Sequence, residues 1–364
     1  MRQCVFVIGT RAQLVKIAPI LRRARKTGLP HVVWLTGQHQ DSMEDLINDF
    51  DLDSPFLRPE NRSEKSNVMQ LVGWLPTAMF RCIQYLRTAR HSDAAAPLVI
   101  VHGDTLSTVL GAVAGRLTGA RVVHVESGLT SGTLFDPFPE ELSRRVAARL
   151  ANYALCPNDA AFRFMARRSG CEAVHTGENS LLDCVRYAMR SDSKAHAGDY
   201  FVASIHRFGN IFRGSTLRKI VDEFCKISAI GPVHFVLHPA TKRRLEHYHL
   251  IEELSRVPQI ILTPRMPYRK FVSLLGNARA VFTDGGSNQE ELSYLGVPTV
   301  LYRDRSERPD GLDRNVILRA DIESSLPEFI GSGRLDSLRR EKEMLDQVQP
   351  SATIVEALAT WTRS

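Results

Sequence analysis

Three carboxylates occupy positions suited to proton transfer. Asp104 follows the apolar run Leu98–Val101, Glu126 follows the run Val122–Val125, and Glu140 opens a predicted helix. Ligands of an open α/β sheet bind beyond the carboxyl ends of the strands. Two acids at such ends and a third on the next helix therefore converge on one pocket. The sequence predicts that this pocket moves a proton at a carbon or oxygen of a substrate.

A simpler interpretation exists for two of the three acids. Asp104 and Glu140 are also placed where helix N-caps or first-turn acids are favoured by the helix dipole. Glu126 is harder to explain in this way, because no obvious helix starts beside it in His124-Val125-Glu126-Ser127-Gly128.

Composition narrows the class of protein. The chain has 364 residues, 43% of them hydrophobic and 24% charged, which is typical of a globular protein with two domains. The net charge is +7, but the arginines are spread along the chain and mixed with acids, and no basic run carries interleaved aromatics. This pattern favours a cleft for a small phosphorylated ligand over a nucleic-acid surface. The apolar N-terminal run is too short for a signal peptide, and no stretch reaches the length of a membrane span.

The cysteines favour a cytoplasmic location. They are scattered and form no CxxC pair, which argues against both a disulfide framework and a metal site. The six positions are Cys4, Cys82, Cys156, Cys171, Cys184 and Cys225.

The elements that must position the acids alternate between strands and helices. The strand-like runs are apolar without alternation, as in a parallel sheet covered on both faces. Predicted strands are Gln3–Ile8, His31–Leu35, Leu98–Val101, Val122–Val125, Tyr153–Cys156, Ala173–His175, Phe201–Ser204, Val233–Leu237, Gln259–Leu262, Ala280–Thr283, Thr299–Leu301 and Val316–Leu318. The predicted fold class is α/β, with two doubly wound Rossmann-like domains facing a central cleft, a favoured location for ligands.

The predicted domains are an N-terminal Rossmann-like domain with the three carboxylates over residues 1–190 and a C-terminal Rossmann-like domain over residues 191–350. The polar stretch Ser191–Asp199 is the predicted linker, and residues 351–364 form a helix that packs back on the first domain. The helix over Val68–Arg90 contains Pro76, so we expect it in two pieces.

A glycine turn after a strand predicts a phosphate site. Within Thr283–Glu291, Gly285, Gly286 and Ser287 open a helix whose N-terminus favours an anion, and Glu291 is placed to bind a ribose diol. The turn matches neither GxxxxGK[ST] nor GxGxxG, and the plain alternative is a glycine turn capped by Ser287.

Basic side chains follow other strands. Arg11, in the turn after the first strand, is suited to clamp a diphosphate. His206 and Arg207 follow the strand Phe201–Ser204, and His238 ends the next strand, where a histidine can titrate or contact a phosphate. A satisfied core histidine is the alternative for His206.

These segments together resemble the non-hydrolysing UDP-N-acetylglucosamine 2-epimerase family. The resemblance spans residues 9 to 309 in the family's order and includes long motifs with their functional side chains intact. The motifs are Gly9-Thr10-Arg11 with Lys16 and Pro19, Gln38-His39, His102-Gly103-Asp104-Thr105, His124–Leu129, Pro139-Glu140-Glu141 with Arg144, His206-Arg207, Thr283–Glu291, and Arg303-Asp304 with Glu307-Arg308-Pro309.

The resemblance implies a glycosyltransferase-B-like fold and reversible inversion at C2 of a UDP-hexosamine. The family's route is anti elimination of UDP to a 2-acetamidoglucal, followed by re-addition of UDP, with no cofactor and no metal. It also implies a homodimer with a role in polysaccharide biosynthesis. By position, the catalytic residues are Asp104, Glu126, Glu140 and His206. The substrate-binding residues are Arg11, Arg144, Arg207, His238, Phe271, Gly285, Gly286, Ser287, Glu291 and Arg308.

The chain departs from the family at several motifs. Ala12-Gln13 replaces the usual Pro-Glu, and Phe208-Gly209-Asn210 follows His206-Arg207 where the family has an acid. The glycine loop reads Asp284-Gly285-Gly286-Ser287 in place of Asp-Ser-Gly-Gly. Changes after Gln38-His39 put activation by a second substrate molecule in doubt, and the substrate is either the plain or a modified UDP-hexosamine.

Three other functions compete with the epimerase. A hydrolysing relative would release UDP and N-acetylmannosamine, but such relatives usually lack Gly-Asp-Thr, which is present here as Gly103-Asp104-Thr105. A glycosyltransferase on the same scaffold would need an acceptor groove and fewer carboxylates. A UDP-sugar sensor without catalytic activity has no evident need for three acids.

Overall fold

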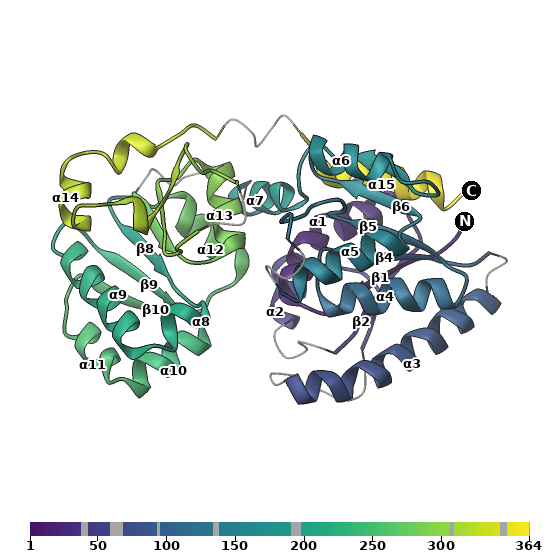
Figure 1. The fold of residues 1–364 in the computed structure, drawn as a ribbon, viewed down its shortest axis with the longest axis horizontal. Coiled ribbons are helices and arrows are strands. Elements are labelled where there is room, and N and C mark those ends of the chain that lie inside the picture. Colours follow the sequence, from purple (N-terminus) through teal and green to yellow (C-terminus); the bar gives the residue numbers. More distant parts are fainter. Residues whose placement is uncertain are drawn as a thin grey trace. The chain divides into compact units, whose positions relative to one another are not determined.

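The computed structural model describes residues 1–37, 43–58, 68–92, 95–133, 138–190, 198–305, 309–342 and 348–363. The chain divides into two compact units, which are described separately (Figure 1). Unit 1 comprises Met1–Cys184 and Val348–Ser364, and unit 2 comprises Val185–Gln347. The predicted linker lies mostly outside the described residues, and the predicted domain assignment stays a prediction.

Unit 1 is built on a seven-stranded parallel sheet in the order β3-β2-β1-β4-β5-β6-β7. The strands are β1 Cys4–Ile8, β2 His31–Leu35, β3 Phe56–Leu57, β4 Leu98–His102, β5 Arg121–Val125, β6 Tyr153–Cys156 and β7 Glu172–His175. The helices are α1 Arg11–Lys26, α2 Glu44–Asp49, α3 Val68–Ser92, α4 Leu106–Leu117, α5 Glu140–Leu150, α6 Asp159–Ala166, α7 Leu181–Arg190, which continues into unit 2, and α15 Pro350–Trp361.

Helices cover both faces of this sheet. β1, β2 and β4 are buried along their whole length, because α3 and α4 pack with α5 over one face and α1 packs with α15 over the other. α15 is joined to β6 by a stacked ring pair, Tyr153 and Trp361, with centroids 4.2 Å apart. The Asp183 carboxylate also accepts a hydrogen bond from the Ser351 amide at 2.7 Å.

Unit 2 repeats the architecture with a six-stranded parallel sheet in the order β10-β9-β8-β11-β12-β13. The strands are β8 Phe201–Ser204, β9 Val233–Leu237, β10 Ile260–Pro264, β11 Ala280–Thr283, β12 Thr299–Leu301 and β13 Val316–Leu318. The helices are α8 Phe208–Ile211, α9 Gly214–Ile227, α10 Pro239–His247, α11 Leu250–Ser255, α12 Tyr268–Gly276, α13 Gly286–Leu295 and α14 Leu326–Gly331. Phe224, Phe235 and Phe282 form the centre of its core.

The prediction of two doubly wound α/β domains is confirmed, and each predicted strand is present within two residues of its expected ends. The short β3 was not predicted. The expected break at Pro76 is wrong, because α3 runs as one helix from Val68 to Ser92. A proline removes only one amide donor from a helix of this length, and the bonds on either side continue the helix. Within the described residues, none of the helices is long and apolar enough to cross a membrane.

Candidate active site

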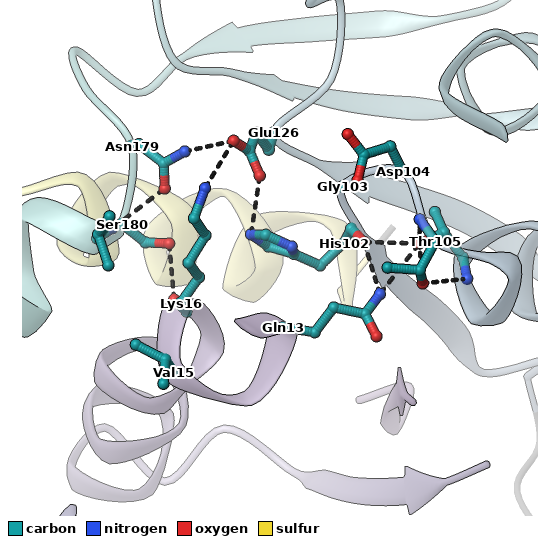
Figure 2. A network of polar contacts seen from close by, with 12 residues as sticks. Gln13, Val15, Lys16, His102, Gly103, Asp104, Thr105, Glu126, Asn179 and Ser180 are labelled. Carbon is teal, nitrogen blue, oxygen red and sulfur yellow. Dashed lines mark hydrogen bonds and ion pairs between the residues drawn. The ribbon is translucent and has the colours of Figure 1, made fainter. Parts of the chain in front are cut away.

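In unit 1, two of the predicted acids follow neighbouring strands. Asp104 lies in the turn after β4, Glu126 lies directly after β5, and the ends of these strands pair in register through His102 and Val125. Asp104 is not a helix cap, because the N-cap of α4 is Thr105, whose hydroxyl accepts from the Thr108 amide. The two carboxylates lie at the same edge of the sheet (Figure 2). Capping of α4 does not explain the position of Asp104.

Glu126 combines an uncommon backbone conformation with a network of side-chain hydrogen bonds. Its φ of 63° lies in the left-handed region, which costs a non-glycine residue about 1–2 kcal/mol. Oε1 of Glu126 accepts hydrogen bonds from Lys16 Nζ at 2.8 Å and Asn179 Nδ2 at 2.7 Å (Figure 2). The side chains of Lys16 and Glu126 are only 6% and 9% exposed, so this ion pair is shielded from solvent. The network fixes an ionised carboxylate at the end of β5.

His102 faces the other oxygen of Glu126. Its Nε2 lies 3.5 Å from Glu126 Oε2 and makes no hydrogen bond within the part of the chain that the structure describes. Burial, opposed in part by the charge of Glu126, lowers the pKa of His102 to about 4. At neutral pH the ring is therefore uncharged, and Lys16 is the cation that balances Glu126.

Gln13 ties this corner of unit 1 together. Its Oε1 accepts from the Gly9 and Thr10 amides, while Nε2 donates to the His102 carbonyl at 2.8 Å and to Thr108 Oγ1 at 3.0 Å. A glutamate in this position has no N–H to donate. Gln13, where the family has glutamate, therefore has a local structural role. Its amide oxygen satisfies two backbone N–H donors, and its amide nitrogen satisfies the His102 carbonyl and the Thr108 hydroxyl.

Asp104 is paired with a cation from α5. Arg144 donates to Asp104 through one guanidinium nitrogen and to Glu141 Oε2 through another, at 2.9 Å. Glu141, fully buried, also accepts from Thr130 Oγ1 at 2.7 Å and Arg145 Nε at 2.8 Å. Arg144 therefore links Asp104, a predicted catalytic residue, to the buried carboxylate of Glu141, which had no predicted role.

Glu141 makes a pH dependence of stability testable. Burial alone would raise its pKa, but hydrogen bonds from Thr130, Arg145 and the Ser131 amide, with the charge of Arg144, lower the pKa from 4.5 to about 2. Its contribution is present above pH 4.5 and is lost as the pH falls toward 2. We expect Glu141→Gln to reduce the unfolding free energy by about 2–3 kcal/mol at pH 7, with little effect at pH 2.

Urea unfolding followed by tryptophan fluorescence measures this effect in unit 1, because Trp34, Trp74 and Trp361 all belong to that unit. An exposed acid, Asp53, supplies the matched control as Asp53→Asn. An equal loss of stability at pH 7 and at pH 2 would contradict the role given to the Glu141 carboxylate.

The remaining unit 1 predictions differ in their surroundings. Glu140 is the first residue of α5, in agreement with a first-turn acid, yet its Oε2 is buried and has no hydrogen-bond partner among the described residues. Arg11 lies in the first turn of α1 and forms a two-bond pair with Asp45, at 2.5 and 3.0 Å. A phosphate would have to compete with Asp45 for Arg11.

In unit 2, Asp284 organises the edge where β8 and β11 end. This fully buried carboxylate accepts from the amides of His206 and Arg207, at 3.0 and 2.8 Å, and from Asn210 Nδ2 at 2.8 Å. His206 Nδ1 lies 3.3 Å from Asp284 Oδ1. The acid therefore orients the predicted histidine and the backbone that carries Arg207.

The glycine loop begins α13. The N-cap is Gly285, without a side-chain cap, so the alternative in which Ser287 caps the helix is wrong. A Cβ on Gly285 would lie 3.0 Å from His206 Cε1, so a larger residue there would force the histidine ring to shift. Gly286 and Ser287 are the first residues of the helix, and Glu291 is buried in its second turn. The uncapped N-terminus suits an anion.

Two further predicted residues lie on neighbouring strand-to-helix connections. His238 is the N-cap of α10, its ring centroid 5.5 Å from that of His206. Burial, together with the charges of His206, Arg265 and Arg243, lowers the pKa of His238 to about 4. Phe271 lies in the first turn of α12. Arg308, Glu307, Gln38 and His39 lie outside the described residues.

Sequence reasoning missed several residues that build these two edges. Lys16 was part of the family motif without an assigned role, and Asn179, Gln13, Glu141 and Asp284 were not proposed as site residues. The only signal was the family motifs, which contain Lys16, Glu141 and Asp284 and from which Gln13 departs, whereas Asn179 lies outside them. Their partners are far away in sequence, so pattern alone could not identify the contacts.

Two Rossmann-like units, each with polar side chains at the carboxyl edge of a parallel sheet, define an α/β protein of the glycosyltransferase-B-like class. A family model described as UDP-N-acetylglucosamine 2-epimerase matches residues 22–359, and the chain belongs to this family.

Relatives and solved structures agree with this assignment. The chain is 28% identical over 324 residues to UDP-N-acetylglucosamine 2-epimerase of Methanocaldococcus jannaschii, covering 84% of this chain and 85% of the relative. The Bacillus subtilis enzyme of that name is 26% identical over 332 residues, covering 85% and 81%. The fold is similar to the Neisseria meningitidis enzyme bound to UDP-GlcNAc, with TM-score 0.76, 21% identity and coverage of 98% and 100%. It is also similar to the M. jannaschii enzyme in complex with UDP-GlcNAc and UDP, with TM-score 0.75, 24% identity and coverage of 99% and 100%.

Proposed function

We propose that this chain is a non-hydrolysing UDP-N-acetylglucosamine 2-epimerase. It would invert C2 of the hexosamine by anti elimination, which removes the C2 proton and UDP and leaves a 2-acetamidoglucal. A proton is then delivered to the opposite face of C2, and UDP adds back at C1. The observation that carries the proposal is the set of three acids in unit 1, two of which are matched by Lys16 and Arg144. The family membership and the relatives named above support the substrate class.

The chemistry explains why such an arrangement is needed. The C2 proton of a hexosamine is not acidic, so the bond from C1 to the UDP oxygen must weaken while the proton leaves. Positive charge then develops at C1, and ionised carboxylates such as Glu126 and Asp104 stabilise it in a site with little water. Burial of the Lys16 and Glu126 pair supports this electrostatic role.

The proton needs an acceptor with an open oxygen. Of the three acids, Glu140 has a buried Oε2 without a hydrogen-bond partner among the described residues. We therefore assign Glu140 to the transfer of the C2 proton, and Glu126 and Asp104 to charge stabilisation. In unit 2, the N-terminus of α13 and His206 would hold the diphosphate, and Phe271 would contact the uracil.

Proton NMR of the purified protein with UDP-N-acetylglucosamine in deuterated water tests the proposal. Deuterium at C2 together with UDP-N-acetylmannosamine is expected. Free N-acetylmannosamine with stoichiometric UDP would replace the proposal with the hydrolysing reaction. No exchange, with this substrate and with modified UDP-hexosamines, would reject the epimerase and turn attention to a glycosyltransferase.

Glu291 is proposed to bind the ribose diol. Replacing it by alanine removes charged hydrogen bonds, so UDP binding is expected to weaken by about 1–3 kcal/mol. Isothermal titration with UDP measures the change, and Glu252→Ala, an exposed acid of α11, is the control. Unchanged affinity in a folded Glu291→Ala protein would remove Glu291 from the ribose site.

A homodimer is part of the same proposal and rests on the family resemblance. Sedimentation velocity of the full chain is expected to give twice the monomer mass of 40.8 kDa. A monomer at all concentrations that retains activity would contradict it.

A further inference from the structure

A pocket in unit 1 lies beside the segment that follows β5 and shares Arg144 with the Asp104 pair described above. Its volume is about 530 Å³, and it is formed by the loop over residues 128–132 together with α5 and α6. A volume of several hundred cubic ångströms is typical of pockets for small organic ligands. This pocket is not required by the reaction proposed above.

Its lining is strongly basic. Four arginines line it, Arg144 and Arg145 near the start of α5, Arg149 at its end, and Arg168 after α6, and no acid is among its described lining residues. Such a group of guanidinium ions favours an anion that can accept paired hydrogen bonds.

Neighbouring acids neutralise only part of this charge. The nearby carboxylates of Glu141 and Asp104 are matched with Arg144 and Arg145. Arg168 donates to the backbone carbonyls of Ala148 and Arg149, so its charge is not neutralised by these contacts. The exposed Arg149 side chain has no ion pair among the described residues. Two positive charges thus remain for a ligand.

One wall of the pocket is apolar. Phe164 on α6 is 54% exposed although it is a large aromatic side chain, and Leu129 also contributes to the lining. An exposed ring beside guanidinium groups suits a ligand that combines a planar ring with an anionic group.

We propose that this pocket binds a nucleoside phosphate, with its phosphates on Arg149 and Arg168 and its base on Phe164. Because Arg144 lines the pocket and also pairs with Asp104, the ligand would contact the same arginine that positions a proposed catalytic acid. The inference concerns a site separate from the one proposed for UDP in unit 2.

Isothermal titration with ADP, inorganic pyrophosphate and adenosine tests this binding. We expect ADP to bind more tightly than pyrophosphate, and adenosine to give no binding. Arg149→Glu is expected to weaken ADP about tenfold or more, whereas the matched charge change Arg167→Glu, on an exposed arginine outside the lining, changes it less than about twofold. Phe164→Ala should weaken ADP and leave pyrophosphate unchanged.

Several results would overturn the proposal. The proposal is wrong if the wild-type protein does not bind ADP, or if Arg149→Glu and Arg167→Glu bind ADP with equal affinity. It is also wrong if pyrophosphate binds as tightly as ADP. UDP is titrated into the same proteins as a separate measurement. Because UDP is also a nucleoside diphosphate and can occupy either site, turnover of UDP-N-acetylglucosamine is measured as well. Absence of epimerisation while ADP binding persists would count against the proposed function alone, and loss of the Arg149 effect on ADP would count against this pocket alone.

Discussion

Replacing Glu126 by glutamine is expected to lower kcat for epimerisation about 1,000-fold or more, because the charge that faces the developing cation is lost. The substitution keeps the shape of the side chain and leaves an acceptor for Lys16 or Asn179. UDP affinity is expected to stay within about tenfold of wild type, since the proposed nucleotide contacts belong to unit 2. Steady-state kinetics with UDP-N-acetylglucosamine and titration with UDP measure the two effects.

The matched control for this change is Asp53→Asn, which removes the charge of an acid that is 84% exposed. It should retain wild-type kcat. If Glu126→Gln kept more than about a tenth of the wild-type kcat, stabilisation by Glu126 would be too small to support the mechanism. Loss of UDP binding in a folded Glu126→Gln protein would also count against a purely chemical role.

The second large effect is expected on stability. Lys16→Met leaves the Glu126 carboxylate, only 9% exposed, without its cation, and breaking such a buried pair costs about 3–5 kcal/mol. Tryptophan fluorescence during urea unfolding reports on unit 1, where all three tryptophans lie.

A double-mutant cycle separates loss of charge balance from loss of packing. The double variant Lys16→Met with Glu126→Gln has neither buried charge, so it should be more stable than Lys16→Met alone. If the two substitutions were strictly additive, the ion pair would contribute no coupling, and the account of this corner of unit 1 would be wrong.

The sequence by itself determined the fold class and the positions of the strands. Apolar runs such as Cys4–Ile8 and Leu98–His102 are buried on both faces, and this pattern depends only on the residues of each strand. The same local order put Asp104 and Glu126 directly after two strands, where a parallel sheet brings side chains together. The glycine loop before α13 was also evident, because glycines between a strand and a helix let backbone amides approach an anion closely.

Only the tertiary structure decided which charges are paired. Lys16 meets Glu126 across 110 positions of sequence, and Arg144 meets Asp104 across 40, so no local pattern could predict either pair. The same is true of Asp284, whose carboxylate orients the backbone of His206 and Arg207 from 78 and 77 positions away, respectively. Helix breaking at Pro76 was predicted from a local rule, yet the remaining hydrogen bonds kept α3 in one piece. Strands can be predicted from the sequence because hydrophobicity is a property of each residue alone. The role of a charged residue depends on its partner, and only the folded structure determines which partner that is.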